Sequence, residues 1–141
     1  MGSVNPTNIS RSIPLQHRAE LRVRFEETDA QGHVHHSKYL NYFEVARGEM
    51  FRAGGRSYRE MEEQGYMLVV VKATCDYRSS ARFDDLLVID TKVVRSKGVR
   101  IVHHYEIRNG DDIVCVGETV LACVDRSGNV QPLPEWLRIK I

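Results

Sequence analysis

One short segment of the chain brings together residue types suited to acid–base and acyl-transfer chemistry. It runs from Asp29 to Tyr39 and has the sequence Asp-Ala-Gln-Gly-His-Val-His-His-Ser-Lys-Tyr. Asp29 supplies a carboxylate that can act as a base or a nucleophile, and a predicted helix begins just after His36. The first turn of a helix presents unpaired N–H groups and the positive end of the helix dipole, which stabilise negative charge. The segment therefore combines a carboxylate with donors for a tetrahedral oxyanion.

Two predicted elements flank this segment and hold it in place. Apolar and charged residues alternate from 19 to 27, which predicts a strand with one buried face. Residues 28–36 show no period, and Gly32 allows close approach of a backbone or substrate, so we expect a loop. From 38 to 52 apolar residues recur at three- and four-residue spacing, followed by Gly-Gly. This pattern predicts one long helix with Ser37 as its N-cap.

The second half of the chain has the composition of β-strands. A short helix is first expected after Ser57, with Glu60 at the capping-box position and Gly65 as the stop. Four predicted strands, rich in Val, Ile, Leu, Thr and Tyr, then follow at 67–78, 86–95, 99–108 and 113–125. We expect His103, on an apolar strand face, to be a hydrogen-bonded core residue. The order predicts an α+β fold with a five-stranded antiparallel sheet against the long helix.

Length and composition indicate a single domain. With 141 residues, 42% hydrophobic and 28% charged, the chain can bury a core without disulfides or metals but is too short for two domains. We expect residues 1–18 to form a flexible lead-in and residues 19–141 to form the domain. No apolar run approaches the roughly 20 residues of a membrane span, and the first residues lack the apolar region of a signal peptide.

Charge and cysteine content exclude several classes of function. Twenty Lys and Arg against 19 Asp and Glu give a formal net charge of +1, unlike a protein that binds nucleic acid or a membrane surface. Cys75, Cys115 and Cys123 are odd in number and form no Cys-x-x-Cys pair, which argues against a disulfide framework and a zinc knuckle. We therefore expect a cytoplasmic protein with no nucleic-acid partner.

The histidines of the loop leave a metal-binding alternative open. His33 and His35 would share one face of an extended loop next to His36, and imidazole is a common ligand of zinc and non-haem iron. The first carboxylate after them is Glu44, too far along the chain to complete a compact ligand set, so we expect no metal. Glu44 is instead spaced for a surface ion pair with Arg47 in the helix, a packed Arg47 being the alternative.

The loop and the helix after it resemble the signature of a known enzyme family. The match consists of residues 25–39, 42–44 and 46–47. They are similar to the signature of the 4-hydroxybenzoyl-CoA thioesterase family of hotdog-fold enzymes, especially its bacterial branch of short-chain and general acyl-CoA thioesterases. The resemblance implies a sheet wrapped around the long helix and hydrolysis of an acyl-CoA thioester to a free acid and coenzyme A. It implies no cofactor, because coenzyme A is part of the substrate.

The resemblance also implies a role for each matching residue. Asp29 matches the catalytic aspartate, which acts either as a nucleophile through a mixed anhydride or as a general base on water. The backbone N–H of His36 matches the oxyanion donor, and the His36 side chain would orient the attacking water or adjust the charge of Asp29. Tyr39 matches a tyrosine that supports the loop and the helix start, and Gly32 belongs to the same motif.

Coenzyme A carries phosphate groups, which a nearly neutral chain must meet with a local cluster of cations. A turn with two cations, a hydroxyl and a glycine makes Ser96, Lys97 and Arg100 candidate contacts for the nucleotide end. A solvated hairpin turn is the alternative. Two other functions fit the same motif: hydrolysis of an acyl-carrier-protein thioester in lipid or polyketide metabolism, and non-catalytic acyl binding.

Several predicted strands have apolar residues on both faces. In the last strand Cys115 and Leu121 fall on one face, and Val116 and Val120 fall on the other. One helix cannot cover both faces of a five-stranded sheet, so we expect a second copy of the chain to cover part of the remainder. The resemblance favours a homotetramer made of two dimers over a simple homodimer.

Overall fold

The computed structural model describes residues 13–139. Its elements are, in chain order, β1 (Gln16–Arg22), the 3-10 turn η1 (Phe25–Glu27), α2 (Lys38–Ala53), α3 (Tyr58–Glu63), β2 (Met67–Tyr77), β3 (Leu86–Lys97), β4 (Arg100–Asn109), β5 (Asp112–Val124) and the 3-10 turn η2 (Glu135–Leu137). Most of the predicted lead-in, residues 1–12, lies outside the described residues. Residues 16–18, the last three of the predicted lead-in, belong to β1 and so to the sheet.

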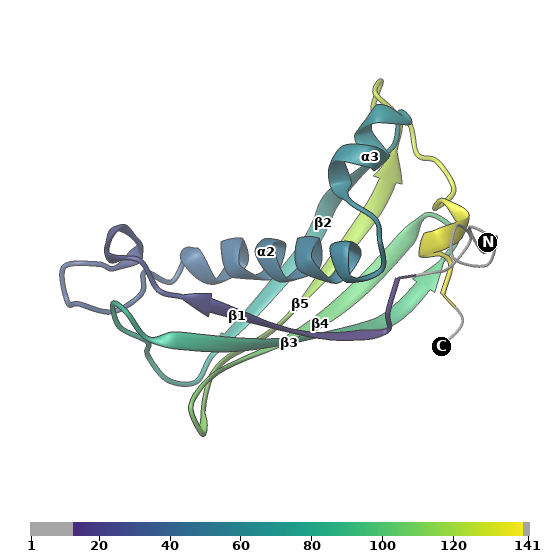
Figure 1. Ribbon diagram of the computed structural model, residues 1–141. Helices are drawn as coiled ribbons and strands as arrows, with labels where there is room; N and C mark the ends of the chain where they lie inside the picture. The colour runs from purple at the N-terminus through teal and green to yellow at the C-terminus, as the bar shows by residue number, and fades with distance from the viewer. Residues whose placement is uncertain (1–12, 140–141) are drawn as a thin grey trace.

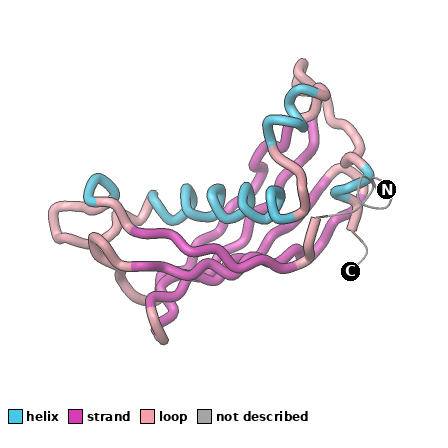
Figure 2. Tube along the Cα trace, in the orientation of Figure 1, coloured by secondary structure: helices cyan, strands magenta, loops and turns pink. Residues whose placement is uncertain are grey.

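The five strands form one antiparallel sheet in the order β1-β3-β4-β5-β2. Helix α2 lies along one face of the curved sheet, and α3 stands at the end of the sheet away from the loop that precedes α2 (Figures 1 and 2). The predicted α+β architecture, with one long and one short helix, is confirmed. The short helix begins as predicted, because the Ser57 hydroxyl accepts the Glu60 N–H at 3.1 Å.

The first predicted strand is displaced along the chain. The alternation from 19 to 27 predicted a strand across that range, but β1 ends at Arg22 and η1 follows. A side-chain hydrogen bond explains the difference, since the Glu27 carboxylate accepts the Arg24 N–H at 2.8 Å and closes a tight turn. The alternating pattern therefore continues beyond the strand itself.

Ser37 is the N-cap residue of the long helix, as predicted, but its side chain does not cap the helix. Ser37 has helical backbone angles, with φ −69° and ψ −20°, and its side chain makes no capping hydrogen bond. Its hydroxyl lies 2.8 Å from Nδ1 of His35 instead. The Ser37 hydroxyl thus contacts the His35 ring instead of a backbone N–H in the first turn of α2.

Helix α2 packs closely on the sheet at one glycine. The Phe43 ring stacks on Tyr105 of β4 with ring centres 4.2 Å apart. A Cβ on Gly117 of β5 would lie 2.5 Å from the Phe43 ring, which no real contact allows. Gly117 therefore sets how closely the helix approaches the sheet.

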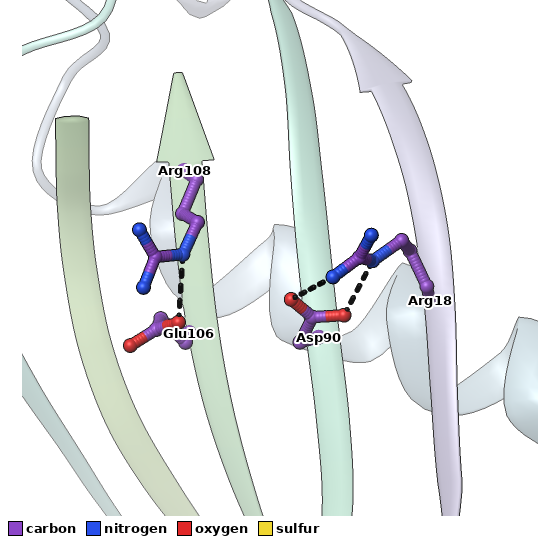
Figure 3. Close-up of polar contacts among 4 residues, drawn as sticks. All are labelled: Arg18, Asp90, Glu106 and Arg108. Carbon is purple, nitrogen blue, oxygen red and sulfur yellow. Dashed lines mark hydrogen bonds and ion pairs between the residues drawn. The ribbon is translucent and has the colours of Figure 1, made fainter. Parts of the chain in front are cut away.

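The opposite face of the sheet is polar over β1, β3 and β4. Arg18 forms an ion pair with Asp90 at 2.8 Å, and Arg108 forms one with Glu106 at 2.8 Å. Figure 3 shows both pairs in front of the strands, with α2 behind them. The ion pairs can be solvated, but Leu86 and Val94 of β3 are exposed as well, so cover of the sheet by a second copy stays a prediction.

Three consecutive exposed valines lie on β2, an edge strand of the sheet. Val69, Val70 and Val71 are 40%, 53% and 49% exposed. Strand β2 pairs only with β5, so its other backbone edge has no strand partner within residues 13–139. An exposed apolar edge strand of this length is typical of a surface that pairs with another chain.

His103 is fully buried in β4 beneath α2. Neither ring nitrogen has a hydrogen-bond partner among the described residues, so the expected hydrogen bond is absent there. Burial, and then the nearby Arg47 guanidinium, lower the pKa of His103 to about 3. His103 is therefore neutral in the folded protein at neutral pH.

We predict that His103 makes the protein less stable in mild acid. Below pH 6.5 the unfolded chain binds a proton at His103 that the folded chain does not, so the free energy of unfolding falls as the pH falls towards 3. The slope approaches about 1.4 kcal/mol per pH unit. His103→Phe removes this contribution. In urea denaturation at several pH values, the free energy of unfolding should therefore fall less steeply for the variant than for the wild type below about pH 5.5. A stability difference that does not change with pH would contradict a neutral buried His103.

Candidate active site

The loop before α2 is closed by its own backbone. The Asp29 N–H donates to the His33 carbonyl at 2.7 Å, and the Gly32 N–H donates to the Asp29 carbonyl at 3.0 Å. Gly32 has a φ of +83°, a conformation that is strained for any residue with a Cβ. Thr28 and Val34 form an isolated bridge that joins the two sides of the loop. The turn therefore fixes the position of Asp29 relative to the start of the helix.

The Asp29 carboxylate is oriented through one oxygen only. Its Oδ1 accepts the N–H groups of Gln31 at 2.9 Å and His33 at 3.2 Å. Within residues 13–139 its Oδ2 receives no hydrogen bond. Slight desolvation acts to raise the pKa of Asp29, but the two backbone donors outweigh it and the pKa lies below its usual range. Asp29 is thus an ionised carboxylate with one oxygen available.

The peptide of His36 leads directly into α2. Its N–H donates to no acceptor among the residues that the structure describes, whereas its carbonyl accepts a hydrogen bond from the Tyr77 hydroxyl of β2 at 3.0 Å. The His36 ring is exposed and stacks on His35 with ring centres 4.3 Å apart. The structure therefore places an unpaired N–H donor at the positive end of the helix dipole.

Tyr39 lies in the first turn of α2 and is only 3% exposed. Its ring packs edge-on against Tyr42 and Tyr77, with ring centres 5.7 and 5.6 Å away. Burial raises the pKa of Tyr39 to about 12. A neutral, packed tyrosine suits support of the helix start rather than proton transfer.

Sequence reasoning missed Glu27, which ties the loop to the helix. Its carboxylate accepts the Tyr42 hydroxyl at 2.9 Å as well as the Arg24 N–H, and its carbonyl accepts the His35 N–H at 2.9 Å. Burial acts to raise the pKa of Glu27, but these donors and the Arg24 guanidinium outweigh it and lower the pKa. The expected strand hid this role, because it made Glu27 one member of an alternating pattern.

The candidate phosphate contacts lie at the other end of the sheet (Figure 1). Lys97 and Arg100 line a cavity of about 380 Å³ together with Arg95. The Ser96 hydroxyl is instead bonded to the Leu137 carbonyl and the Ile139 N–H, so it holds the C-terminal segment. Strand β3 separates this end from the Asp29 loop by roughly 40 Å at 3.3 Å per residue. The structure brings Lys97 and Arg100 together but not with Asp29.

Arg47 is buried rather than on the helix surface. It is 6% exposed and donates to the hydroxyls of Tyr58 at 3.0 Å and Tyr105 at 3.1 Å. The expected ion pair with Glu44 is wrong, although both residues line cavities of about 330 and 220 Å³ between the helices and β2. The packed alternative for Arg47 is correct.

The loop histidines are not gathered around a common point. From residue 13 to residue 139 no group of three or more His, Cys, Asp and Glu side chains is arranged to hold a metal ion. Nδ1 of His35 lies 2.8 Å from the Ser37 hydroxyl.

Among residues 13–139 no helix has the length and apolar character needed to cross a membrane.

Known proteins share both the sequence and the fold of this chain. The sequence model of the Thioesterase-like superfamily matches residues 23–141. The acyl-CoA thioesterase YbgC of Haemophilus influenzae is 35% identical over 114 residues, which cover 80% of this chain and 83% of that protein. The acyl-CoA thioester hydrolase YbgC of Escherichia coli O157:H7 is 35% identical over 109 residues, covering 77% and 81%. The crystal structure of a DHNA-CoA thioesterase from Staphylococcus aureus has a TM-score of 0.81 at 30% identity, covering 84% and 80%.

These matches and the geometry of the loop define a hotdog-fold thioesterase. The chain belongs to the Thioesterase-like superfamily. The family that the motif indicated is confirmed, and the protein is a thioester hydrolase.

We predict that the Tyr77 hydroxyl supports turnover by holding the His36 peptide. Tyr77→Phe removes one hydrogen bond, worth about 1 kcal/mol, and should lower kcat for a thioester substrate about fivefold. Tyr66→Phe is the matched control, because the Tyr66 hydroxyl makes no hydrogen bond within the described residues. Equal kcat values in the two variants, at equal melting temperatures, would contradict this role of Tyr77.

Proposed function

We propose that this enzyme hydrolyses acyl-CoA thioesters, with Asp29 as the essential carboxylate and the His36 N–H as the oxyanion donor. One observation carries the proposal: the free Oδ2 of an ionised Asp29 and the unpaired His36 N–H belong to the same closed loop at the start of α2. The names of the YbgC relatives support coenzyme A as the carrier.

In the proposed reaction negative charge develops on the carbonyl oxygen of the thioester. The His36 N–H and the dipole of α2 stabilise this charge. Asp29 attacks the carbonyl carbon, the coenzyme A thiolate leaves, and water then hydrolyses the mixed anhydride to the free acid. General-base activation of a water molecule by the ionised Asp29 carboxylate is the alternative route. The exposed His36 ring would orient the water. The reaction requires no cofactor.

The proposed assembly is a homodimer or a dimer of dimers in which a second copy covers the exposed edge of β2. The three adjacent valines of β2 and its unpaired backbone edge support this arrangement. Lys97 and Arg100 would then contact the phosphates of a substrate bound at the Asp29 loop of another copy, since their own loop lies at the far end of the sheet. The free thiols suit the cytoplasmic location expected from the sequence.

The essential role of Asp29 can be tested against a matched turn in the same chain. Asp125 has the same turn, since its Oδ1 accepts the N–H groups of Ser127 and Asn129, both at 2.9 Å, and its carbonyl accepts the Gly128 N–H. Its Oδ2 differs from that of Asp29, because it accepts the Gln131 side-chain N–H at 3.1 Å. An Asn side chain keeps the accepting oxygen in both turns. We expect Asp29→Asn to lower kcat/KM for acyl-CoA by at least about 10³-fold and Asp125→Asn to leave it unchanged, at similar melting temperatures.

Retained turnover in Asp29→Asn would overturn the assignment of Asp29. Matched acyl-CoA and acyl-carrier-protein substrates separate the two carriers: a higher specificity constant for the acyl-carrier protein would replace the proposed substrate. Binding of an acyl-CoA without turnover by the wild type would favour the non-catalytic alternative.

The proposed assembly predicts that a charge on β2 breaks the oligomer. Val70→Asp should shift the wild-type dimer or tetramer to a monomer in sedimentation velocity, because the charge would be buried against the second copy. Val130→Asp is the control, since Val130 is 60% exposed on the C-terminal segment. A monomeric wild type, or equal oligomers in both variants, would exclude an interface along β2.

A further inference from the structure

Two thiols meet beneath the start of α2. Cys75 of β2 lies opposite Gly117 of β5, and Tyr77 lies opposite Cys115, so the two cysteines are diagonal neighbours across this strand pair. Their Sγ atoms are 3.0 Å apart. All three cysteines of the chain are free thiols, and Cys123 lies further along β5. The fold therefore brings one pair of sulfur atoms into contact and leaves the third thiol apart from that pair.

We propose that Cys75 and Cys115 form a reversible dithiol–disulfide pair that small peroxides oxidise and that lowers thioesterase activity when oxidised. The regulatory part rests on the proposed function, whereas formation of the bond does not. Cys75 is partly exposed and Cys115 is fully buried. A peroxide therefore reaches Cys75 first, and Cys115 resolves the product.

The reaction balances with a peroxide as its only oxidant. The Cys75 thiolate attacks one peroxide oxygen, the O–O bond breaks, and the departing hydroxide takes a proton to become water. Cys115 then attacks the sulfur of the Cys75 sulfenic acid, the S–O bond breaks, and the oxygen leaves as a second water with the Cys115 proton. Burial raises the pKa of the Cys115 thiol, which keeps Cys115 protonated until this second step.

Contacts link the thiol pair to the site. Cys75 and Tyr77 are two residues apart on β2, so their side chains lie on the same face of the strand. The Tyr77 hydroxyl donates to the His36 carbonyl at 3.0 Å. A disulfide draws the sulfur atoms of Cys75 and Cys115 from 3.0 Å to about 2.05 Å and so shifts the strand next to Tyr77. Oxidation thus disturbs the side chain that holds the peptide next to α2.

A direct test uses hydrogen peroxide on the reduced, full-length protein. Alkylation followed by mass spectrometry of a non-reducing digest should show free thiols falling from three to one, a Cys75–Cys115 cross-link and an unmodified Cys123. Turnover of acyl-CoA should fall about fivefold, the effect expected from losing the hydrogen bond between the Tyr77 hydroxyl and the His36 carbonyl. Reduction with dithiothreitol should restore the turnover.

Two variants separate the switch from general oxidative damage. Cys75→Ser replaces the sulfur with an oxygen in a side chain of similar shape and cannot form the disulfide, so it should keep its activity in peroxide. Cys123→Ala should remain as sensitive as the wild type. Three intact thiols, a different cross-link, or equal loss of activity in Cys75→Ser would overturn the proposal, and a Cys75–Cys115 cross-link without loss of activity would overturn its regulatory part. Because the cross-link is read without any substrate, its result stands even if acyl-CoA proves not to be the substrate.

Discussion

The loop at the candidate site depends on the hydrogen bonds of Glu27. Its carbonyl holds the His35 N–H, and its buried carboxylate holds the Arg24 N–H and the Tyr42 hydroxyl. The first contact joins the two ends of the loop, and the other two join Glu27 to the residue that precedes η1 and to α2. Burying a carboxylate costs free energy unless donors satisfy it, and here backbone and phenol donors do so. These hydrogen bonds therefore fix the position of the turn around Asp29 relative to the start of α2.

Local turn geometry alone does not make a reactive carboxylate. Asp29 and Asp125 share the same Asx turn with glycine at the fourth position, and the pKa of each lies below its usual range. Two features differ. Oδ2 of Asp125 accepts the Gln131 side-chain N–H at 3.1 Å, whereas Oδ2 of Asp29 accepts no hydrogen bond within residues 13–139, and the chain that follows each turn is different. Asp125 leads into an irregular C-terminal segment, whereas Asp29 leads into α2 through the unpaired N–H of His36. The chemistry of the site arises from placing an ordinary turn before a long helix, with a second strand holding the junction.

Patterns within the local sequence predicted the parts of the structure that depend on local sequence. Periodicity located the long helix and four strands closely, and the spacing of Asp29, Gly32 and His36 located the loop. The strand order and the partners of His36 were not predictable in this way, because the Tyr77 contact spans a separation of 41 positions. Side chains with several available partners also misled the prediction: Ser37 paired with a histidine ring instead of capping α2.

Strand β2 links three properties of the protein that the sequence presents separately. Its outer edge exposes valines, its last residue Tyr77 holds the His36 peptide, and its Cys75 contacts Cys115. An edge strand has neighbours on one side only, so it is held less firmly than the central strands and responds more to a partner or a new bond. A second copy along β2 would restrain the strand that holds the proposed oxyanion donor. The proposed assembly and the proposed thiol switch would therefore both act on the geometry of the helix start through one strand, without any change in the loop that carries Asp29.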